Sequence, residues 1–438
     1  MSVFGKVDLF NVGLGAATTT EARTGYGFSS AALFPQWCGR TELTNTVGAA
    51  NIQRGMGGGI STTERHLISS QSQDAQAAAV TDQGAREDAL IGTLTTAGAW
   101  EGYADISAIG SDGWTKIIDN AFVNNIANQL LAVGGSEITT ERIVVTEPAA
   151  IGIQTISGLS GIPSAIIILS SPGGVSPPTP VTDSRYMIGI AVRTLDGTIK
   201  NGIMAGGSND GELTTVTRAY CRAGTGAAGD SFIGISNDHT NINSRGRVTQ
   251  MNVSGQFQIT WDEVIGDQAR DYECVVIYGG SHDIQTFQTL TNTFTPIIIS
   301  GLNFLPVGGK IFSSSNNSAS VADTLDLKDE LSMGMFAWNP SGVLEQNVMC
   351  TRDGDGELSS ETTTLIRNDE VYGNISGVDT LDGALAVTNR DFDELTMQMT
   401  NADPSGNFCW AWIFGSAVNP SHLSGGHLGS SHLAGGRL

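Results

Sequence analysis

Ser157-Gly-Leu-Ser-Gly-Ile-Pro163-Ser-Ala-Ile-Ile-Ile-Leu-Ser170 opens a stretch that closes at Gly279-Gly280, and imperfect copies of this stretch lie on both sides of it. The opening recurs over Ser300–Ser314, as Ser-Gly-Leu-Asn-Phe-Leu-Pro-Val-Gly-Gly-Lys-Ile-Phe-Ser-Ser, and more faintly over Thr24–Phe34. The closing apolar run with its glycine recurs over Asn128–Gly135 and Phe408–Ser416. The chain therefore repeats one pattern of opening and closing three times.

A third marker lies between these two ends. Asp210-Gly-Glu-Leu in the middle copy corresponds to Asp355-Gly-Glu-Leu in the last, with a weaker echo at Gly59–Arg65 in the first. Each copy is far longer than the ~20–50 residues of a solenoid repeat, so each is long enough for its own core. We predict three tandem modules and a tail, at residues 1–140 (with an N-terminal arm), 141–283, 284–418 and 419–438.

Composition predicts the class of fold. Hydrophobic residues make up 40% of the chain and charged residues only 15%, while glycine alone contributes 56 residues. This inventory is rich in turn formers and hydroxyls and poor in the residues that fill helices. We expect an all-β protein of three antiparallel β-sandwich, jelly-roll-like modules.

The strand pattern is clearest late in each module. Tyr103–Ile109 alternates in polarity, turns at Ser111-Asp-Gly113 and continues into Trp114–Ile118, which predicts a hairpin. Similar hairpins are expected over 246–261 and 383–399. Helical turns are expected only at 72–81 and 121–131, and Thr-rich linkers at 136–148 and 281–296. The Pro/Gly-rich segment 170–180 is expected to be an exposed loop.

Charge and targeting signals limit the possible partners. The net charge is −22, from 44 acidic and 22 basic residues, without a basic cluster, which argues against nucleic acid and anionic membrane surfaces. Met1–Asp8 does not resemble a secretory signal and no apolar run reaches ~18 residues, so we expect synthesis in the cytoplasm and no membrane span. The five cysteines are predicted to be buried core thiols.

Residues 419–438 repeat every five residues. The repeat reads Ser-His-Leu-Ser-Gly, Gly-His-Leu-Gly-Ser, Ser-His-Leu-Ala-Gly, Gly-Arg-Leu. The alternatives are an extended strand or a β-helical coil docked on a partner, or a disordered end; one coil is not stable alone. We expect this tail to mediate assembly through His422, Leu423, His427, Leu428, His432, Leu433, Arg437 and Leu438.

Candidate chemical sites are weak. Asp353, Asp355 and Glu357 resemble the start of a calcium loop, but Thr364 stands where an EF-hand would supply glutamate, so an acidic tight turn is favoured over a metal site. No cofactor is implied. The histidines outside the tail occupy non-equivalent positions and no shared catalytic triad can be assembled from them: His66, His239 and His282. Acidic pairs at Glu101/Asp105 and Asp262/Glu263 are candidates for glycoside hydrolysis, with solvated surface acids as the alternative.

The opening over Gly158–Ile168, its copy over Gly301–Phe312, the hairpin and the close at Val275–Gly280 together resemble β modules of structural proteins from tailed bacteriophages and prophages. Those modules have a "GLGF-x-P" opening and a "LALGG"-like close; the first module here lacks the proline. The resemblance covers most of residues 24–416. It implies a location in the virion and no defined activity.

The favoured hypothesis is a non-enzymatic virion structural protein: a decoration, collar or fibre component. We predict that it assembles with itself, as a homotrimer that buries exposed strand edges, and with other virion proteins. The alternative is an adhesin that binds a receptor or host surface glycan, through aromatics such as Trp37, Trp100 or Trp338. A depolymerising hydrolase is the third hypothesis.

Overall fold

The computed structural model describes residues 2–416, except 14, 42, 44–48, 171–179, 226, 228–229, 236–241, 266–269, 315–325, 328, 355, 357–361 and 377–379. Within these ranges the chain forms strands and no helix, and every strand pairing is antiparallel. The prediction of an antiparallel all-β protein is therefore confirmed. Among the same residues there is no helix that is long and apolar enough to cross a membrane.

The strands repeat in three sets of eleven along the described chain, and we call the segments that carry them unit 1 (2–135), unit 2 (136–279) and unit 3 (280–416). Unit 1 contains β1 (Phe4–Val12), β2 (Thr20–Thr24), β3 (Ser30–Trp37), β4 (Ala49–Ala50), β5 (Ile52–Gly59), β6 (Arg65–Ser72), β7 (Thr81–Arg86), β8 (Ile91–Leu94), β9 (Trp100–Gly110), β10 (Gly113–Asn120) and β11 (Ile126–Gly134). Unit 2 contains β12 (Thr139–Thr146), β13 (Gly152–Ser157), β14 (Ala165–Ser170), β15 (Val181–Thr182), β16 (Ser184–Arg193), β17 (Ile199–Ser208), β18 (Thr217–Gly224), β19 (Ile233–Ile235), β20 (Ser244–Val253), β21 (Gln256–Glu263) and β22 (Asp271–Tyr278). Unit 3 contains β23 (Ser281–Gln288), β24 (Pro296–Ser300), β25 (Leu305–Ser314), β26 (Asp326–Leu327), β27 (Asp329–Trp338), β28 (Leu344–Asp353), β29 (Thr362–Arg367), β30 (Tyr372–Ser376), β31 (Thr380–Asp391), β32 (Glu394–Asn401) and β33 (Phe408–Ser416).

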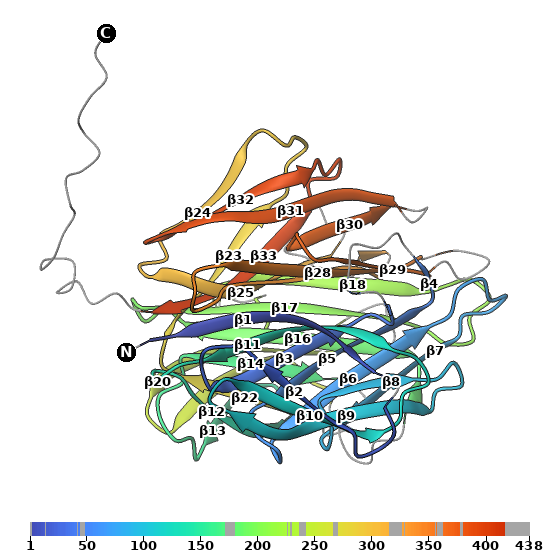
Figure 1. Ribbon diagram of the computed structural model, residues 1–438, viewed down its shortest axis with the longest axis horizontal. Helices are drawn as coiled ribbons and strands as arrows, with labels where there is room; N and C mark the ends of the chain where they lie inside the picture. Colours follow the sequence, from blue (N-terminus) through green and yellow to red (C-terminus); the bar gives the residue numbers. More distant parts are fainter. Residues whose placement is uncertain are drawn as a thin grey trace, which may run out of the picture.

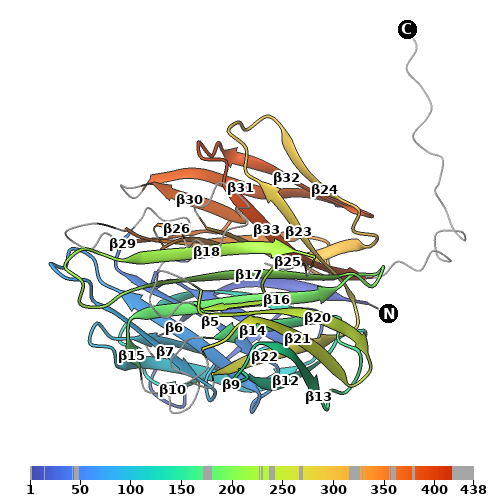
Figure 2. The same cartoon turned by 180° about the vertical axis from the view of Figure 1, so that it is seen from behind.

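Each unit builds one seven-stranded inner sheet and one four-stranded outer sheet, with the same strand order in all three. The inner sheets run β1-β11-β3-β5-β6-β7-β15, β12-β22-β14-β16-β17-β18-β26 and β23-β33-β25-β27-β28-β29-β4. The outer sheets run β2-β10-β9-β8, β13-β21-β20-β19 and β24-β32-β31-β30. Figure 1 shows the outer sheet of unit 3 at the top of the molecule. Figure 2 shows the molecule from the opposite side, where the strands of unit 2 face the viewer.

The last strand of each inner sheet comes from another unit. Unit 2 supplies β15 to unit 1, unit 3 supplies β26 to unit 2, and unit 1 supplies β4 to unit 3. Because the third exchange returns to the unit from which the chain started, the exchange is cyclic. The three units therefore form a closed ring within one polypeptide.

One central core joins the three units. Buried side chains of all three inner sheets pack into a single cluster, including Phe34 and Leu131 of unit 1, Ile167 of unit 2, and Trp410 and Trp412 of unit 3. Separate clusters fill the space between the inner and outer sheets of each unit. The inner sheets are thus buried on both faces, which explains continuous apolar runs such as Ala165–Leu169 where a half-exposed strand would alternate.

Two local predictions are wrong. Residues 72–81 contain the end of β6 and an irregular connection to β7, and residues 121–131 lead directly into β11, so neither segment is helical. In the first, the backbone bonds unit 2 instead of closing a helical turn, since the Ala79 amide donates to the Glu212 carbonyl oxygen at 2.8 Å. In the second, burial of β11 on both faces outweighs local propensity.

The stretches expected to be linkers, 136–148 and 281–296, instead hold β12 and β23, which form one edge of the inner sheets of units 2 and 3. Threonine-rich edge strands and linkers look alike in sequence because neither has an alternating apolar face. Most of the segment expected to be a loop, 170–180, lies outside the described residues.

Candidate functional site: the interfaces between units

The interface between units 1 and 2 is called the 1–2 interface, and the other two are named in the same way. Polar side chains beside the exchanged strand β15 form hydrogen bonds across it. Asp183 follows β15 with a positive φ of 69°, and its Oδ1 accepts the Asp210 amide at 2.9 Å. Asp210 Oδ1 in turn accepts the amide of Thr81, the first residue of β7 in unit 1, at 2.9 Å. We call this arrangement a clasp, because unit 2 holds the first residue of a unit 1 strand through two carboxylates.

The 3–1 interface contains the same clasp. Asn51 follows β4 with a φ of 65°, and its Oδ1 accepts the Asp74 amide at 2.9 Å. Asp74 Oδ1 accepts the amide of Thr362, the first residue of β29 in unit 3, at 2.9 Å. Asparagine and aspartate tolerate the left-handed backbone and bond neighbouring amides, which explains their choice at this position.

The 1–2 and 2–3 interfaces also have corresponding hydrogen bonds in common. Thr81 Oγ1 donates to the Ser208 carbonyl oxygen at 3.1 Å, and Thr217 Oγ1 donates to the Asp353 carbonyl oxygen at 3.1 Å. The amides of Gly211 and Gly356 donate to carbonyl oxygens of the neighbouring unit, both at 2.8 Å. The glycines of the repeated Asp-Gly pairs therefore mark contacts between units, a role that sequence analysis missed. The only signal was that an Asp-Gly and a strand-initial threonine recur together.

Arg54 lies where the three units meet. Its side chain is 2% exposed, its Nε donates to Ser70 Oγ within unit 1 at 3.2 Å, and its Nη1 donates to Thr351 Oγ1 of unit 3 at 3.1 Å. Its guanidinium carbon lies 4.0 Å from the centre of the Tyr186 ring of unit 2. One buried cation thus contacts all three units, in the geometry of a cation–π pair.

Amide side chains and a buried amine join units 3 and 1. Gln36 Nε2 donates to Gln129 Oε1 at 2.8 Å and to the Met333 carbonyl oxygen at 2.7 Å, and Gln129 Nε2 donates to the Val348 carbonyl oxygen at 2.9 Å. Lys310 Nζ donates to Gln36 Oε1 at 3.0 Å. Burial of Lys310 lowers the pKa of its amine to about 7, because loss of water disfavours the charged form.

Tryptophans fill the contact of unit 3 with units 2 and 1. Trp410 stacks on Phe312 with ring centres 4.3 Å apart and donates its indole N–H to the Ile203 carbonyl oxygen of unit 2 at 3.1 Å. Trp412 donates to His282 Nδ1 at 3.3 Å and meets Phe34 of unit 1 edge-on. Since His282 Nε2 lies 3.0 Å from the Gly279 carbonyl oxygen, the neutral Nε2–H tautomer satisfies both contacts. Burial lowers its pKa to about 4.

The two ends of the described chain meet at the 3–1 interface, and β1 contacts β28 beside them. The Val3 amide donates to Ser416 Oγ at 3.0 Å, Lys6 forms an ion pair with Glu345, and the Val7 amide donates to Glu345 Oε2 at 3.2 Å. Figure 1 shows the N-terminus beside the end of β33. Units 1 and 2, and units 2 and 3, are joined covalently at the corresponding places, so this junction is the non-covalent counterpart of the other two.

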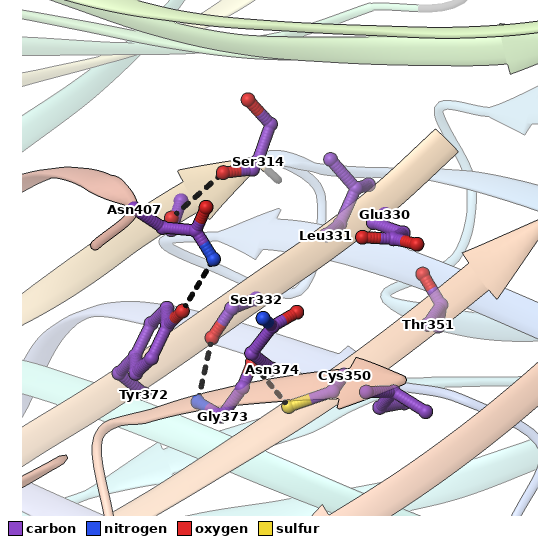
Figure 3. Close-up of a pocket in the computed structure, with 12 residues that line it drawn as sticks. Ser314, Glu330, Leu331, Ser332, Cys350, Thr351, Tyr372, Gly373, Asn374 and Asn407 are labelled. Atoms are coloured by element: carbon purple, nitrogen blue, oxygen red, sulfur yellow. Dashed lines mark hydrogen bonds between the residues drawn. The ribbon is translucent and has the colours of Figure 1, made fainter. Parts of the chain in front are cut away.

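A small polar cavity lies inside unit 3 (Figure 3). It has a volume of about 10 Å³ and is lined by Ser313, Ser332, Cys350 and Asn407 among others. Beside it, Tyr372 Oη donates to Asp403 Oδ2 at 2.6 Å and accepts from Asn407 Nδ2 at 2.9 Å. A space of this size holds about one water molecule. The cavity therefore has no room for an organic substrate.

The weak metal candidate is only partly described. Asp353 is 1% exposed at the end of β28, and its Oδ2 accepts Ser72 Oγ of unit 1 at 2.9 Å. Asp355 and Glu357 lie outside the described residues. Among the residues that the structure does describe, no group of three His, Cys, Asp or Glu side chains is arranged to hold a metal ion. Asp353 thus takes part in the 3–1 interface.

The candidate catalytic histidines are buried or lie outside the described residues, and the candidate acids are engaged by neighbouring side chains. His66 and His282 are each 1% exposed in the interior, and His239 lies outside the described residues. Burial lowers the pKa of His66 to about 3. The candidate acids of the hydrolase hypothesis are engaged as follows: Asp105 pairs with Arg65, Asp262 with Arg247, Glu263 with Arg245, and Glu101 Oε2 accepts Thr93 Oγ1.

The candidate ligand-binding tryptophans and the cysteines are largely interior. Trp37 is fully buried, Trp338 is 8% exposed with Arg390 over its ring, and Trp100 is half-buried with Arg86 over its ring. The prediction of buried core cysteines is confirmed: all five are free and buried. All residues of the proposed assembly tail, 419–438, lie outside the described residues.

Comparison with known proteins gives no family. No family model matches the sequence, and no curated protein matches it. Among solved structures, the outer-membrane expressed OmpT of Vibrio cholerae is aligned at 7% identity over 94% of this chain and 98% of that chain, with a TM-score of 0.11. A likeness this low carries no argument about fold or function.

Proposed function

We propose that the chain is a structural protein of a bacteriophage virion that acts by assembly and not by catalysis, and that its three units are tandem copies of one jelly-roll-like sandwich. The observation that carries this proposal is the cyclic strand exchange around a common core. Buried polar side chains bridge one unit to the next: Arg54, Gln36, Gln129, Lys310 and Asp353.

The construction suits a mechanical role. A pair of sandwiches joined by a flexible linker bends, whereas units that share a core and exchange strands move as one body. The acidic balance of −22 disfavours contact with packaged nucleic acid and suits an external position on a particle. The sequence resemblance to tailed-phage modules points in the same direction.

The direct experiment is quantitative mass spectrometry of purified particles from the phage or prophage that encodes the chain, with the major capsid protein as internal standard. A decoration protein is expected at hundreds of copies per particle and a collar or fibre component at a handful to a few tens. Absence of the chain from particles that carry all other structural proteins contradicts the proposal. A handful of copies together with binding of particles to host glycans would favour an adhesin.

Self-association beyond the single chain stays a prediction. The homotrimer was expected because strand edges need partners; here β7, β18 and β29 are paired with strands from within the same chain. Other edges remain available in the outer sheets, where Ile151 before β13 and Ile153 within it are each 68% exposed and Phe294 before β24 is 89% exposed. Light scattering distinguishes the 45.7 kDa chain from its trimer. Host glycan and other virion proteins remain proposed partners.

A further inference from the structure

We propose that each interface between units is a complete recognition site for a neighbouring copy of the unit, so that the ring holds together without the two covalent links between units. The chain is then equivalent to a three-subunit assembly on one polypeptide. This inference concerns how the molecule holds together and does not rest on its proposed place in a virion.

The junction between units 3 and 1 is non-covalent. Units 3 and 1 have no peptide link between Ser416 and Val3, yet they exchange β4, share the core and close the ring. The peptide links of the other junctions run through 135–138 and 279–280, where Ser136 and Gly279 are exposed at the surface. One of the three interfaces therefore forms without a peptide link of its own.

The clasp occurs at both the 1–2 and the 3–1 interface. At two interfaces the exchanged strand is followed by a residue in the left-handed conformation, Asn51 or Asp183. Its side chain accepts the amide of an aspartate of the same unit, Asp74 or Asp210. That aspartate accepts the first amide of a strand in the neighbouring unit. Main-chain pairing gives affinity in strand addition, and the flanking side chains fix the register. The partner that fits this site is another unit with the same exchanged strand and clasp residues.

The covalently linked interfaces have side-chain contacts of their own. The 1–2 interface contains the fork of Arg142, which bonds Glu273 within unit 2 at 2.5 and 2.7 Å and reaches Glu87 of unit 1 at 3.2 Å. The 2–3 interface contains the Trp410–Ile203 hydrogen bond at 3.1 Å and the Lys200–Asp283 ion pair at 2.6 Å. None of these contacts involves a residue of the links at 135–138 or 279–280.

The test uses the full chain with a glycine-flanked protease site inserted after Ser136 and another between Gly279 and Gly280. The chain is folded first, both sites are cut, and mass spectrometry confirms complete cleavage. We expect the three pieces to elute together at the volume of the uncut chain at micromolar concentration, with unchanged far-ultraviolet circular dichroism. Separation of the pieces, or precipitation of any one of them, overturns the proposal.

A matched pair of variants tests the clasp in the cut protein. Asp210→Ala removes the acceptor for Thr81, whereas Asp196→Ala removes a carboxylate that bonds only within its own turn, to Thr194 and to the Thr198 amide at 3.0 Å. We expect Asp210→Ala to raise the concentration at which units 1 and 2 separate by about tenfold, the scale of one charged hydrogen bond. Asp196→Ala should leave that concentration unchanged. Equal effects of the two variants would show that the clasp is not a recognition element.

Discussion

The guanidinium carbon of Arg54 lies 4.0 Å from the centre of the Tyr186 ring, and this contact joins unit 1 to unit 2 while the same guanidinium bonds Thr351 of unit 3. A desolvated cation over an aromatic face is stabilised by about 2 kcal/mol. We predict that the double-mutant cycle of Arg54→Ala and Tyr186→Leu, measured by denaturant unfolding, gives a coupling energy of about 2 kcal/mol. Additive effects of the two substitutions would mean that the contact does not connect the units.

A second prediction concerns the packing of unit 2 against unit 3. A Cβ atom at Gly202 would lie 2.7 Å from the Trp410 ring, closer than real Cβ contacts come. Gly202→Ala should therefore destabilise the protein by about 1–3 kcal/mol, the usual cost of overpacking. The control is Gly110→Ala in an exposed hairpin, where the nearest atom is 3.8 Å away and the change should stay within about 0.5 kcal/mol. Similar losses for both variants would contradict the packing described at this interface.

The third prediction follows from the buried lysine. Because the pKa of Lys310 is lowered from 10.5 to about 7, the unfolded chain binds more protons than the folded chain between these values, so stability should rise as pH increases from 7 to 10. The corresponding ladder positions in units 1 and 2 hold Phe34 and Ile167, both apolar. Lys310→Met should remove up to about 4 kcal/mol of this rise.

The control for the lysine is Lys200→Met, which removes an amine paired with Asp283. Denaturant unfolding at pH 7, 8.5 and 10 should show the rise in the wild type and in Lys200→Met, and a flatter profile in Lys310→Met. An unchanged profile in Lys310→Met would show that the Lys310 amine is solvated in the folded protein.

The fourth prediction concerns acid. The pKa of His66 is lowered from 6.5 to about 3, with burial as the main cause and the neighbouring Arg142 as a second. Protonation is therefore favoured in the unfolded chain, and stability that is fully present above pH 6.5 should be lost as pH falls from 6.5 towards 3. His66→Leu should reduce the loss between pH 6.5 and 4 by about 3 kcal/mol. His282, whose pKa is about 4, should retain its own share of the loss. Identical acid profiles for wild type and His66→Leu would place His66 in contact with solvent.

Much of the strand content was predictable, because it depends on local pattern. The hairpin around Ser111-Asp-Gly113 forms as expected between β9 and β10, and the closing glycines fall where chains come close. At Gly279 a Cβ would lie 1.8 Å from the Glu137 carbonyl oxygen, so the repeated glycine is required by sterics as well as by its φ of 80°.

The ring itself was not predictable from one sequence. The exchanged strands are two residues long, too short for any periodicity, and Ala49 pairs with Thr364 far along the chain. Arg54, Gln36 and Lys310 look in sequence like ordinary polar residues of half-exposed strands, because nothing local indicates that the inner sheets are covered on both faces. The Asp-Gly repeat was visible, yet its partner Thr81 belongs to another unit, so its role could be found only from the fold.

The three units share one core, and we predict that they unfold together in one cooperative transition. Hydrogen-exchange mass spectrometry across a guanidinium titration tests it directly, through peptides that cover β11, β22 and β33, one central strand from each inner sheet. If the units interlock as described, the three peptides should lose protection at the same denaturant concentration, in one cooperative transition. Three separate midpoints, one for each unit, would contradict the account.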